Sequence, residues 1–219
     1  MIPQNILDEI IINCHNPDSI YIVGSSILNI NHPNDIDLLL LYNKESVPIR
    51  RYAIISEDGV RYECFCDTYK EELSNVINIC FAWTTLKLAK NIYGDDLLNS
   101  DKYKDFLHNI DLINNSTYRK EVCFKIYNEM MFVKTLKGSF DNKENRFGTN
   151  YLYKCYRCLL ICYIINNNSY ELTEAQKETL NIVHDAREMS DDLWKFCIEL
   201  IEREVGFIIW QHPKLYLQH

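Results

Sequence analysis

The first half of the chain places short apolar runs between turn residues, a pattern typical of strands joined by tight connections. Residues 36–42 are almost entirely apolar and predict a strand that is buried on both faces. Further strands are predicted where β-branched and aromatic residues gather beside a glycine or a turn, at residues 19–23, 51–56 and 60–66. The sequence Glu57-Asp58-Gly59 between the last two runs predicts a β-hairpin.

Apolar residues at helical spacing predict one helix before the first strand, short helices between strands, and a largely helical second half. The predicted helices cover residues 3–14, 25–30, 70–76, 116–137, 149–166, 173–188 and 191–204. Each of the last four begins near a Ser, Thr or Asp that can cap its first turn. Residues 138–148 and 166–169 are polar and predict loops. Residues 77–83 suit either a fifth strand or the start of a helix that extends to Tyr93.

These elements predict an α+β protein with a small mixed β-sheet domain, flanked by helices, followed by an α-helical bundle domain. We expect the first domain at residues 1–98 and the helical domain at residues 99–219. A chain of 219 residues is long enough for such a core without disulfide bonds.

The composition narrows the class of protein. With 47 % hydrophobic and 25 % charged residues, the chain has the composition of a folded globular protein rather than a disordered one. The longest apolar runs, residues 38–42 and 159–165, are too short to span a bilayer, and the N-terminus lacks the features of a signal peptide. The short apolar runs predict no membrane partner. An odd number of cysteines, nine, without an export signal indicates a reduced, cytoplasmic protein.

Cysteines cluster at two places in the sequence. Cys155, Cys158 and Cys162 share one face of a predicted helix with apolar residues, which favours thiols packed in a core over a metal centre. Cys64 and Cys66 alternate along a predicted strand and are expected on its core side.

The charge is unevenly distributed. The net charge of −8 excludes a uniformly basic nucleic-acid-binding surface. Residues 110–157 nevertheless hold 9 basic and 5 acidic side chains, so the middle of the chain is locally basic. Two interpretations remain open for this zone, namely a solvated helix face and a surface that binds phosphate groups.

One stretch carries residues suited to catalysis. A predicted strand ends at Gly24-Ser25-Ser26, and the next begins with Asp35 and Asp37. Residues two apart on a strand point the same way, so the two carboxylates face the same space. A glycine at such a turn lets a ligand approach the backbone closely, and the amides and hydroxyls of the two serines can then bind a triphosphate.

A third carboxylate is expected from the predicted hairpin. Glu63 reaches the aspartates if its strand pairs beside theirs, and Asp67 on the same strand face is a rival. Three converging carboxylates repel one another unless divalent cations lie between them. Two Mg²⁺ ions, with Mn²⁺ as the alternative, suit these oxygen ligands and a phosphoryl-transfer reaction. Each part alone also has an ordinary structural interpretation, as a turn or a solvent-facing strand residue.

Gly24-Ser25 together with Asp35-Ile36-Asp37 resembles the signature of the DNA polymerase β-like nucleotidyltransferase superfamily, in particular its small members with a C-terminal helical domain. The resemblance covers about residues 19–98. It implies transfer of a nucleoside monophosphate from an NTP, with ATP favoured, to a hydroxyl group, and release of pyrophosphate. It further implies that Asp35, Asp37 and the third carboxylate bind the metals, while Gly24 and Ser25 hold the triphosphate.

Two departures from the family pattern matter. The third acid is Glu63, where the family often has Asp, and no Arg follows the Gly-Ser pair. A basic residue for the phosphates must come from elsewhere, and Lys154 and Arg157 in the basic zone are the candidates.

Several acceptors and one alternative function stay open. The acceptor hydroxyl belongs to RNA, such as a tRNA 3′ end, to a protein, or to an antibiotic or other small molecule. The alternative is a catalytically silent member that binds nucleotides or another protein. Oligomeric state and nucleotide preference do not follow from the sequence.

Overall fold

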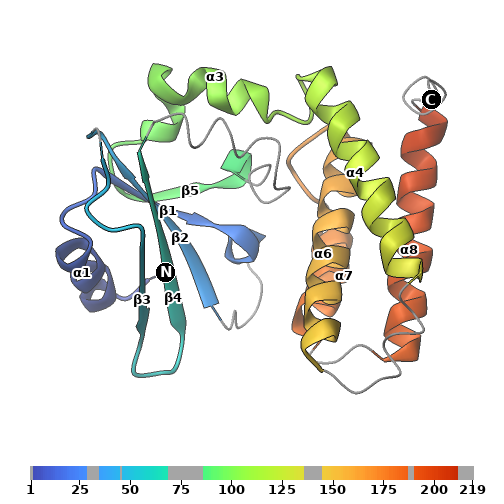
Figure 1. Ribbon diagram of the computed structural model, residues 1–219, viewed down its shortest axis with the longest axis horizontal. Helices are drawn as coiled ribbons and strands as arrows, with labels where there is room; N and C mark the ends of the chain where they lie inside the picture. The colour runs from blue at the N-terminus through green and yellow to red at the C-terminus, as the bar shows by residue number, and fades with distance from the viewer. Residues whose placement is uncertain are drawn as a thin grey trace. The chain divides into compact units, whose positions relative to one another are not determined.

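The computed structural model describes residues 2–28, 35–44, 46–68, 86–135, 145–186 and 190–211 of the chain (Figure 1). The chain forms two compact units, Met1–Ile110 and Asp111–His219. The first contains a mixed sheet and the second is helical, which confirms the predicted α+β class. The unit boundary lies after helix α3 (Asp101–Asn109), and the division into domains at residues 98 and 99 stays a prediction.

A five-stranded sheet forms the centre of the first unit, in the order β3-β4-β2-β1-β5 (Figure 1). Its strands are β1 (Ser19–Val23), β2 (Asp35–Tyr42), β3 (Arg51–Ile55), β4 (Arg61–Thr68) and β5 (Lys90–Gly94). The pair β2–β4 is parallel, and the other neighbouring strands are antiparallel. The four strands predicted from the first half of the sequence are therefore confirmed, as is the hairpin between β3 and β4.

Helix α1 (Gln4–Asn13) packs against one face of this sheet. It contributes Ile6 and Ile10, and these side chains join alternate residues of the central strands in one apolar core. Cys64 and Cys66 lie in this core, as their alternation along the strand predicted. The opposite residues of β2 and β4, which alternate with the core residues, form the other face of the sheet.

Three elements of the first unit differ from the prediction. Residues 90–94 form strand β5 against β1, so the alternative of a helix extending to Tyr93 is wrong. The 3₁₀ helix η3 (Leu97–Asn99) and α3 were not predicted, because η3 has only three residues and α3 is short and mostly polar. The predictions for residues 70–76 and 77–83 fall outside the described residues.

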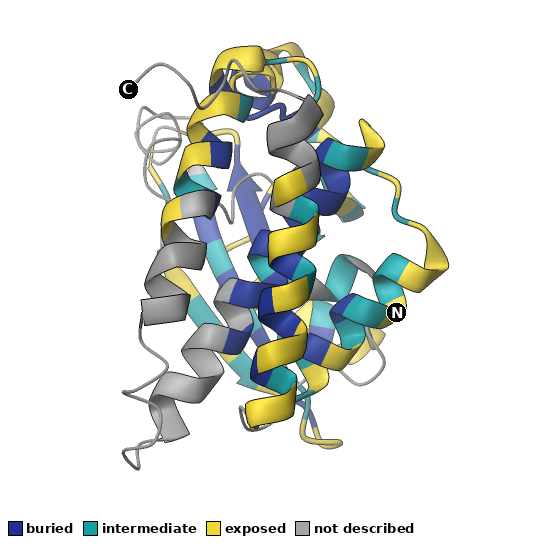
Figure 2. Cartoon of the chain, turned by 90° about the vertical axis from the view of Figure 1, so that its right-hand side faces the viewer, coloured by how far each residue is buried: buried dark blue, intermediate teal, exposed yellow. Residues whose placement is uncertain are grey.

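The second unit consists of α4 (Ser116–Thr135), α6 (Asn145–Asn167), α7 (Glu174–Asp185) and α8 (Asp191–Gln211). Helix α6 contacts the other three, and buried and exposed residues alternate along the helices (Figure 2). The four predicted helices are confirmed, but residues 145–148, predicted as loop, begin α6. Cys155, Cys158 and Cys162 are fully buried, as expected for core thiols.

The eight cysteines among the described residues are all buried thiols. Within the same residues, none of the helices combines the length and apolar character that a membrane-spanning helix requires.

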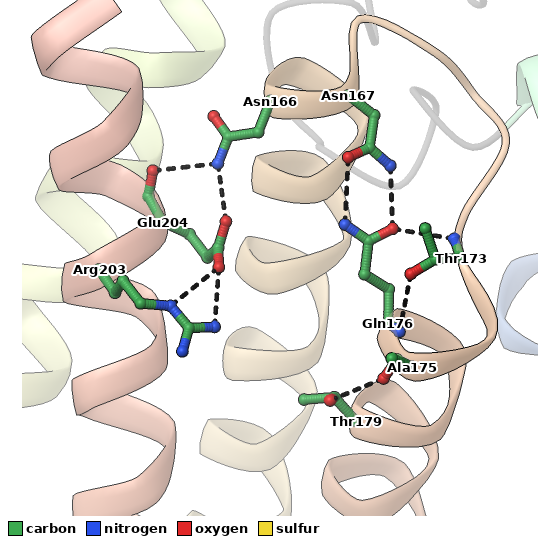
Figure 3. Close-up of polar contacts among 8 residues, drawn as sticks. All are labelled: Asn166, Asn167, Thr173, Ala175, Gln176, Thr179, Arg203 and Glu204. Atoms are coloured by element: carbon green, nitrogen blue, oxygen red, sulfur yellow. Dashed lines mark hydrogen bonds and ion pairs between the residues drawn. The ribbon is translucent and has the colours of Figure 1, made fainter.

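A capping box begins helix α7 (Figure 3). The Thr173 hydroxyl accepts a hydrogen bond from the Gln176 amide at 3.3 Å, and the Gln176 side chain accepts one from the Thr173 amide at 3.0 Å. We expect Thr173→Ala to lower the free energy of unfolding by about 1 kcal/mol, because the cap that satisfies the first turn is lost. Urea denaturation measures the change.

Thr179→Ala is the matched control, since this hydroxyl lies within the same helix and donates to the Ala175 carbonyl at 2.9 Å. The Ala175 carbonyl already belongs to the helix, so removal of the Thr179 hydroxyl is expected to change the free energy of unfolding by less than about 0.5 kcal/mol. Equal losses in the two variants would contradict a capping role for Thr173.

Candidate functional site

Gly24 directly follows the last residue of β1, at the point where the strand ends. Its φ of +70° is in the left-handed region that glycine adopts without strain. A Cβ atom at this position would lie 2.5 Å from Oδ2 of Asp37. The absence of a side chain therefore brings the Gly24 backbone directly against the Asp37 carboxylate.

The register of the sheet brings the predicted carboxylates together. In the β1–β2 pair Val23 is opposite Asp37, and in the parallel β2–β4 pair Asp37 is opposite Glu63. Asp35 lies two residues before Asp37 on the same strand and therefore faces the same side. Asp35 is exposed, whereas Asp37 and Glu63 are half-buried.

Asp37 is the electrostatic centre of this group. Burial, followed by the negative charges of Asp35 and Glu63, raises the pKa of Asp37 from its ordinary value of 3.8 to about 6. Desolvation makes the largest contribution, and the charges of both neighbours add to it. Because the negative charges of these carboxylates repel one another, a cation bound beside Asp37 would be stabilised.

Glu63 is paired with a cation of the protein itself. Its Oε1 lies 2.6 Å from Nη2 of Arg61, which is two residues away on the same strand face. Among the described residues, no three His, Cys, Asp or Glu side chains are arranged to hold a metal ion together. The donor set of Asp35 and Asp37 suits a hard divalent cation, and Glu63 joins it only on leaving Arg61.

The rival acid Asp67 lies farther along β4, opposite Leu41. Four residues of strand separate it from Glu63, a distance of about 13 Å. Glu63 is therefore the third carboxylate that the fold places beside Asp37, which the sequence alone left undecided.

The two serines after Gly24 lie in a five-residue 3₁₀ helix, η1 (Gly24–Leu28). The Ser26 hydroxyl donates to the backbone carbonyl of Asp35 at 3.3 Å and so links this turn to the start of β2. The backbone of Ser25 follows Gly24 directly, but its side chain is outside the described part. A phosphate-binding role for Gly24, Ser25 and Ser26 stays a prediction.

Lys154 and Arg157 lie on α6, in the helical unit. Arg157 is half-buried, and the Lys154 side chain is outside the described part. The neighbouring Tyr156 is buried and makes an edge contact with His184 at a ring-centroid distance of 5.7 Å, so it is a core residue. A phosphate-binding role for the two basic residues stays a prediction.

A cavity of about 280 Å³ lies on the hairpin beside the carboxylates, and we call it the hairpin cavity. Its lining residues come from β3 and β4 and are Arg51, Tyr52, Ala53, Arg61, Glu63, Cys64 and Phe65. The two arginines were not predicted as site residues from the sequence. For Arg61 the signal was its alternation with Glu63 along one strand, which places Arg61 and Glu63 on the face that carries the aspartates.

Gly24→Ala is expected to impair the site more than the fold. The new methyl group meets a flexible carboxylate, so Asp37 must move by several tenths of an ångström, and the left-handed backbone adds about 1 kcal/mol of strain. We expect a modest fall in melting temperature together with at least about a tenfold loss of activity, since small misplacements at a reacting centre are costly. A variant that keeps full activity would show that this contact has no functional role.

Comparison with known proteins gives little beyond this geometry. No protein-family model matches the sequence, and no curated protein matches it. Among solved structures the chain is similar to a nucleotidyltransferase-like protein from Exiguobacterium sibiricum 255-15. The TM-score is 0.33 at 10 % sequence identity, over 97 % of this chain and 77 % of that one.

Proposed function

We propose that the protein is a magnesium-dependent nucleotidyltransferase. It transfers a nucleoside monophosphate from an NTP, in the first place ATP, to a hydroxyl group of an acceptor. The observation that carries this proposal is the position of Asp37. Its half-buried carboxylate lies against the Gly24 backbone, and the charges of Asp35 and Glu63 help to raise its pKa to about 6.

In this proposal, residues of the chain bind the metal ions and the triphosphate. Asp35 and Asp37 would hold the divalent ions, with Glu63 as the third carboxylate. When bound, Mg²⁺ or Mn²⁺ offsets the repulsion among these carboxylates and neutralises the triphosphate. The amides after Gly24 would bind phosphate oxygens, because the glycine leaves the backbone accessible there.

The transfer forms one bond to the α-phosphorus and breaks another. The acceptor oxygen forms a bond to the α-phosphorus, and the bond from that phosphorus to the oxygen bridging to the β-phosphate breaks. Pyrophosphate leaves with the electron pair of the broken bond. The hydroxyl proton passes to a carboxylate of the site or to solvent.

Pyrophosphate release and label transfer test this function. The full chain is incubated with each α-labelled NTP, Mg²⁺ and, in separate reactions, total tRNA, a host protein extract or an aminoglycoside. We expect label on one acceptor class and an equal amount of pyrophosphate, both lost on addition of EDTA. Glu57→Gln, an exposed substitution in the hairpin turn, is the control and should retain full activity.

The ion pair between Arg61 and Glu63 favours one alternative function. A third carboxylate neutralised by an arginine suits a catalytically silent module that binds a nucleotide without reacting. Such a protein would show a thermal shift with NTP and Mg²⁺ but release no pyrophosphate with any acceptor.

A further inference from the structure

The hairpin cavity and the Gly24 turn lie on opposite sides of Asp37. Strand β2 has β1 as its neighbour on one side and β4 on the other, and β3 lies beyond β4. Gly24 follows β1, whereas the cavity is lined by residues of β3 and β4. Glu63 belongs both to the cavity lining and to the carboxylate group, so the cavity opens directly beside the candidate site.

In-line displacement gives these two sides different roles. The attacking oxygen and the leaving oxygen lie on opposite sides of the transferred phosphorus. If the triphosphate is bound beside Gly24, as in the proposed function on which this inference rests, the leaving pyrophosphate lies on the β1 side. The acceptor hydroxyl then approaches from the β4 side, where the hairpin cavity is.

The lining of the cavity selects the chemistry of the acceptor. Two arginines and one glutamate give it a positive charge, although the net charge of the whole chain is −8. The Arg51 guanidinium lies over the Phe65 ring, 5.3 Å from its centroid. Guanidinium groups bind phosphate through paired hydrogen bonds, and a guanidinium or aromatic plane stacks on nucleobases.

We propose that the hairpin cavity binds the 3′-terminal nucleotide of a single-stranded nucleic-acid acceptor, with Arg51 and Arg61 contacting its phosphate and base. A cavity of about 280 Å³ is at the small end of ligand sites and suits one nucleotide. Arg61 exchanges Glu63 for the phosphate in this complex, so acceptor binding releases the third carboxylate. The terminal hydroxyl is the group that attacks the α-phosphorus.

Fluorescence anisotropy of a labelled single-stranded oligoribonucleotide with a free 3′ hydroxyl, bound to the full chain, tests this proposal. Arg51→Gln is expected to weaken binding about tenfold, since it removes a charge-assisted contact. The slope of log affinity against log salt should fall by about 0.7, as for one lost phosphate contact on a single strand. Arg51→Lys should restore the salt slope but only part of the affinity, because lysine keeps the charge without the planar group.

Lys90→Gln is the matched control, because Lys90 is an exposed cation on β5, at the opposite edge of the sheet. Its affinity for the oligoribonucleotide should equal that of the wild type, and Mg²⁺-NTP binding, followed by thermal shift, should be unchanged in all variants. The proposal is overturned if the wild type does not bind the oligonucleotide, or if Arg51→Gln binds like Lys90→Gln. Label transfer to protein alone would also overturn it.

The outcome for the proposed function is read separately. A wild-type chain that releases no pyrophosphate with any acceptor lacks the proposed activity, whatever its affinity for the oligonucleotide. A chain that releases pyrophosphate but does not bind the oligonucleotide keeps the activity and loses only this assignment of the acceptor. A matched oligodeoxyribonucleotide distinguishes an RNA acceptor from a DNA acceptor.

Discussion

Asp37→Asn is expected to abolish nucleotidyl transfer and, at the same time, to stabilise the ligand-free protein near neutral pH. Transfer should fall by at least about a thousandfold, because the central anionic ligand of the proposed metal site is lost. The gain in stability follows from the raised pKa of Asp37, since the charged carboxylate is disfavoured in the folded state. Function and stability thus make opposite demands on this side chain.

The pH dependence follows from the direction of this shift. The folded state holds the Asp37 proton up to about pH 6, whereas the unfolded chain releases it near the ordinary pKa of 3.8. The folded state therefore binds more protons in this window, and stability falls as the pH rises through it. The full penalty is present above about pH 6. At pH 7 it is at most about 3 kcal/mol, and partial solvent exposure reduces the expected gain in Asp37→Asn to about 1–2 kcal/mol.

Urea denaturation of the wild type and Asp37→Asn between about pH 4 and pH 8 measures this effect. The two proteins should be equally stable at the acidic end, where the aspartate is protonated, and should diverge toward neutral pH. Glu57→Gln removes an exposed carboxylate from the hairpin turn and should show no such divergence. A destabilised Asp37→Asn variant, or one that still transfers label, would contradict the role assigned to Asp37.

Gly94→Ala is expected to lower the free energy of unfolding by about 3–5 kcal/mol, the largest stability loss among these substitutions. Gly94 has a φ of +69°, and a Cβ atom there would lie 1.9 Å from the backbone carbonyl oxygen of Asp18. Because that oxygen belongs to the main chain just before β1, it has no rotamer by which to move away. The end of β5 must separate from β1, and the pairing of Gly94 with Ser19 is lost.

Gly59→Ala separates steric overlap from backbone strain. Gly59 has a φ of +84°, but a Cβ atom there meets nothing within 4 Å. The free energy of unfolding of this variant should therefore fall only by the cost of alanine in the left-handed conformation, about 1–2 kcal/mol. Urea denaturation of both variants gives the comparison, and similar losses would show that the contact with Asp18 is relieved without disrupting the strand pair.

Local patterns predicted the elements that carry a strong local signal. The apolar run of β2 and the Glu57-Asp58-Gly59 turn identify their strands without knowledge of the partners. Strand β5 has no such signal, since the sequence Lys90-Asn91-Ile92-Tyr93-Gly94 suits the end of a helix equally well. Its strand structure comes from pairing with β1, a contact between residues far apart in the sequence.

The same distinction applies to the candidate site. The spacing of Asp35 and Asp37 and the glycine at the end of β1 are local features, and both were found from the sequence. The choice between Glu63 and Asp67 depends on the register of a parallel strand pair, which no short stretch of sequence specifies. The ion pair of Glu63 with Arg61 was missed because alternation along a strand places two side chains on one face without specifying that they pair.

The burial of the thiols gives each compact unit its own reporter of opening. Cys14, Cys64 and Cys66 lie in the sheet core. The neighbouring Cys64 thiol, together with burial, raises the pKa of Cys14 to about 12, so its reactive thiolate is scarce. Cys155 and Cys162 report in the same way on the helical unit. An alkylating reagent followed by peptide mass spectrometry therefore times the opening of the two cores independently in one experiment.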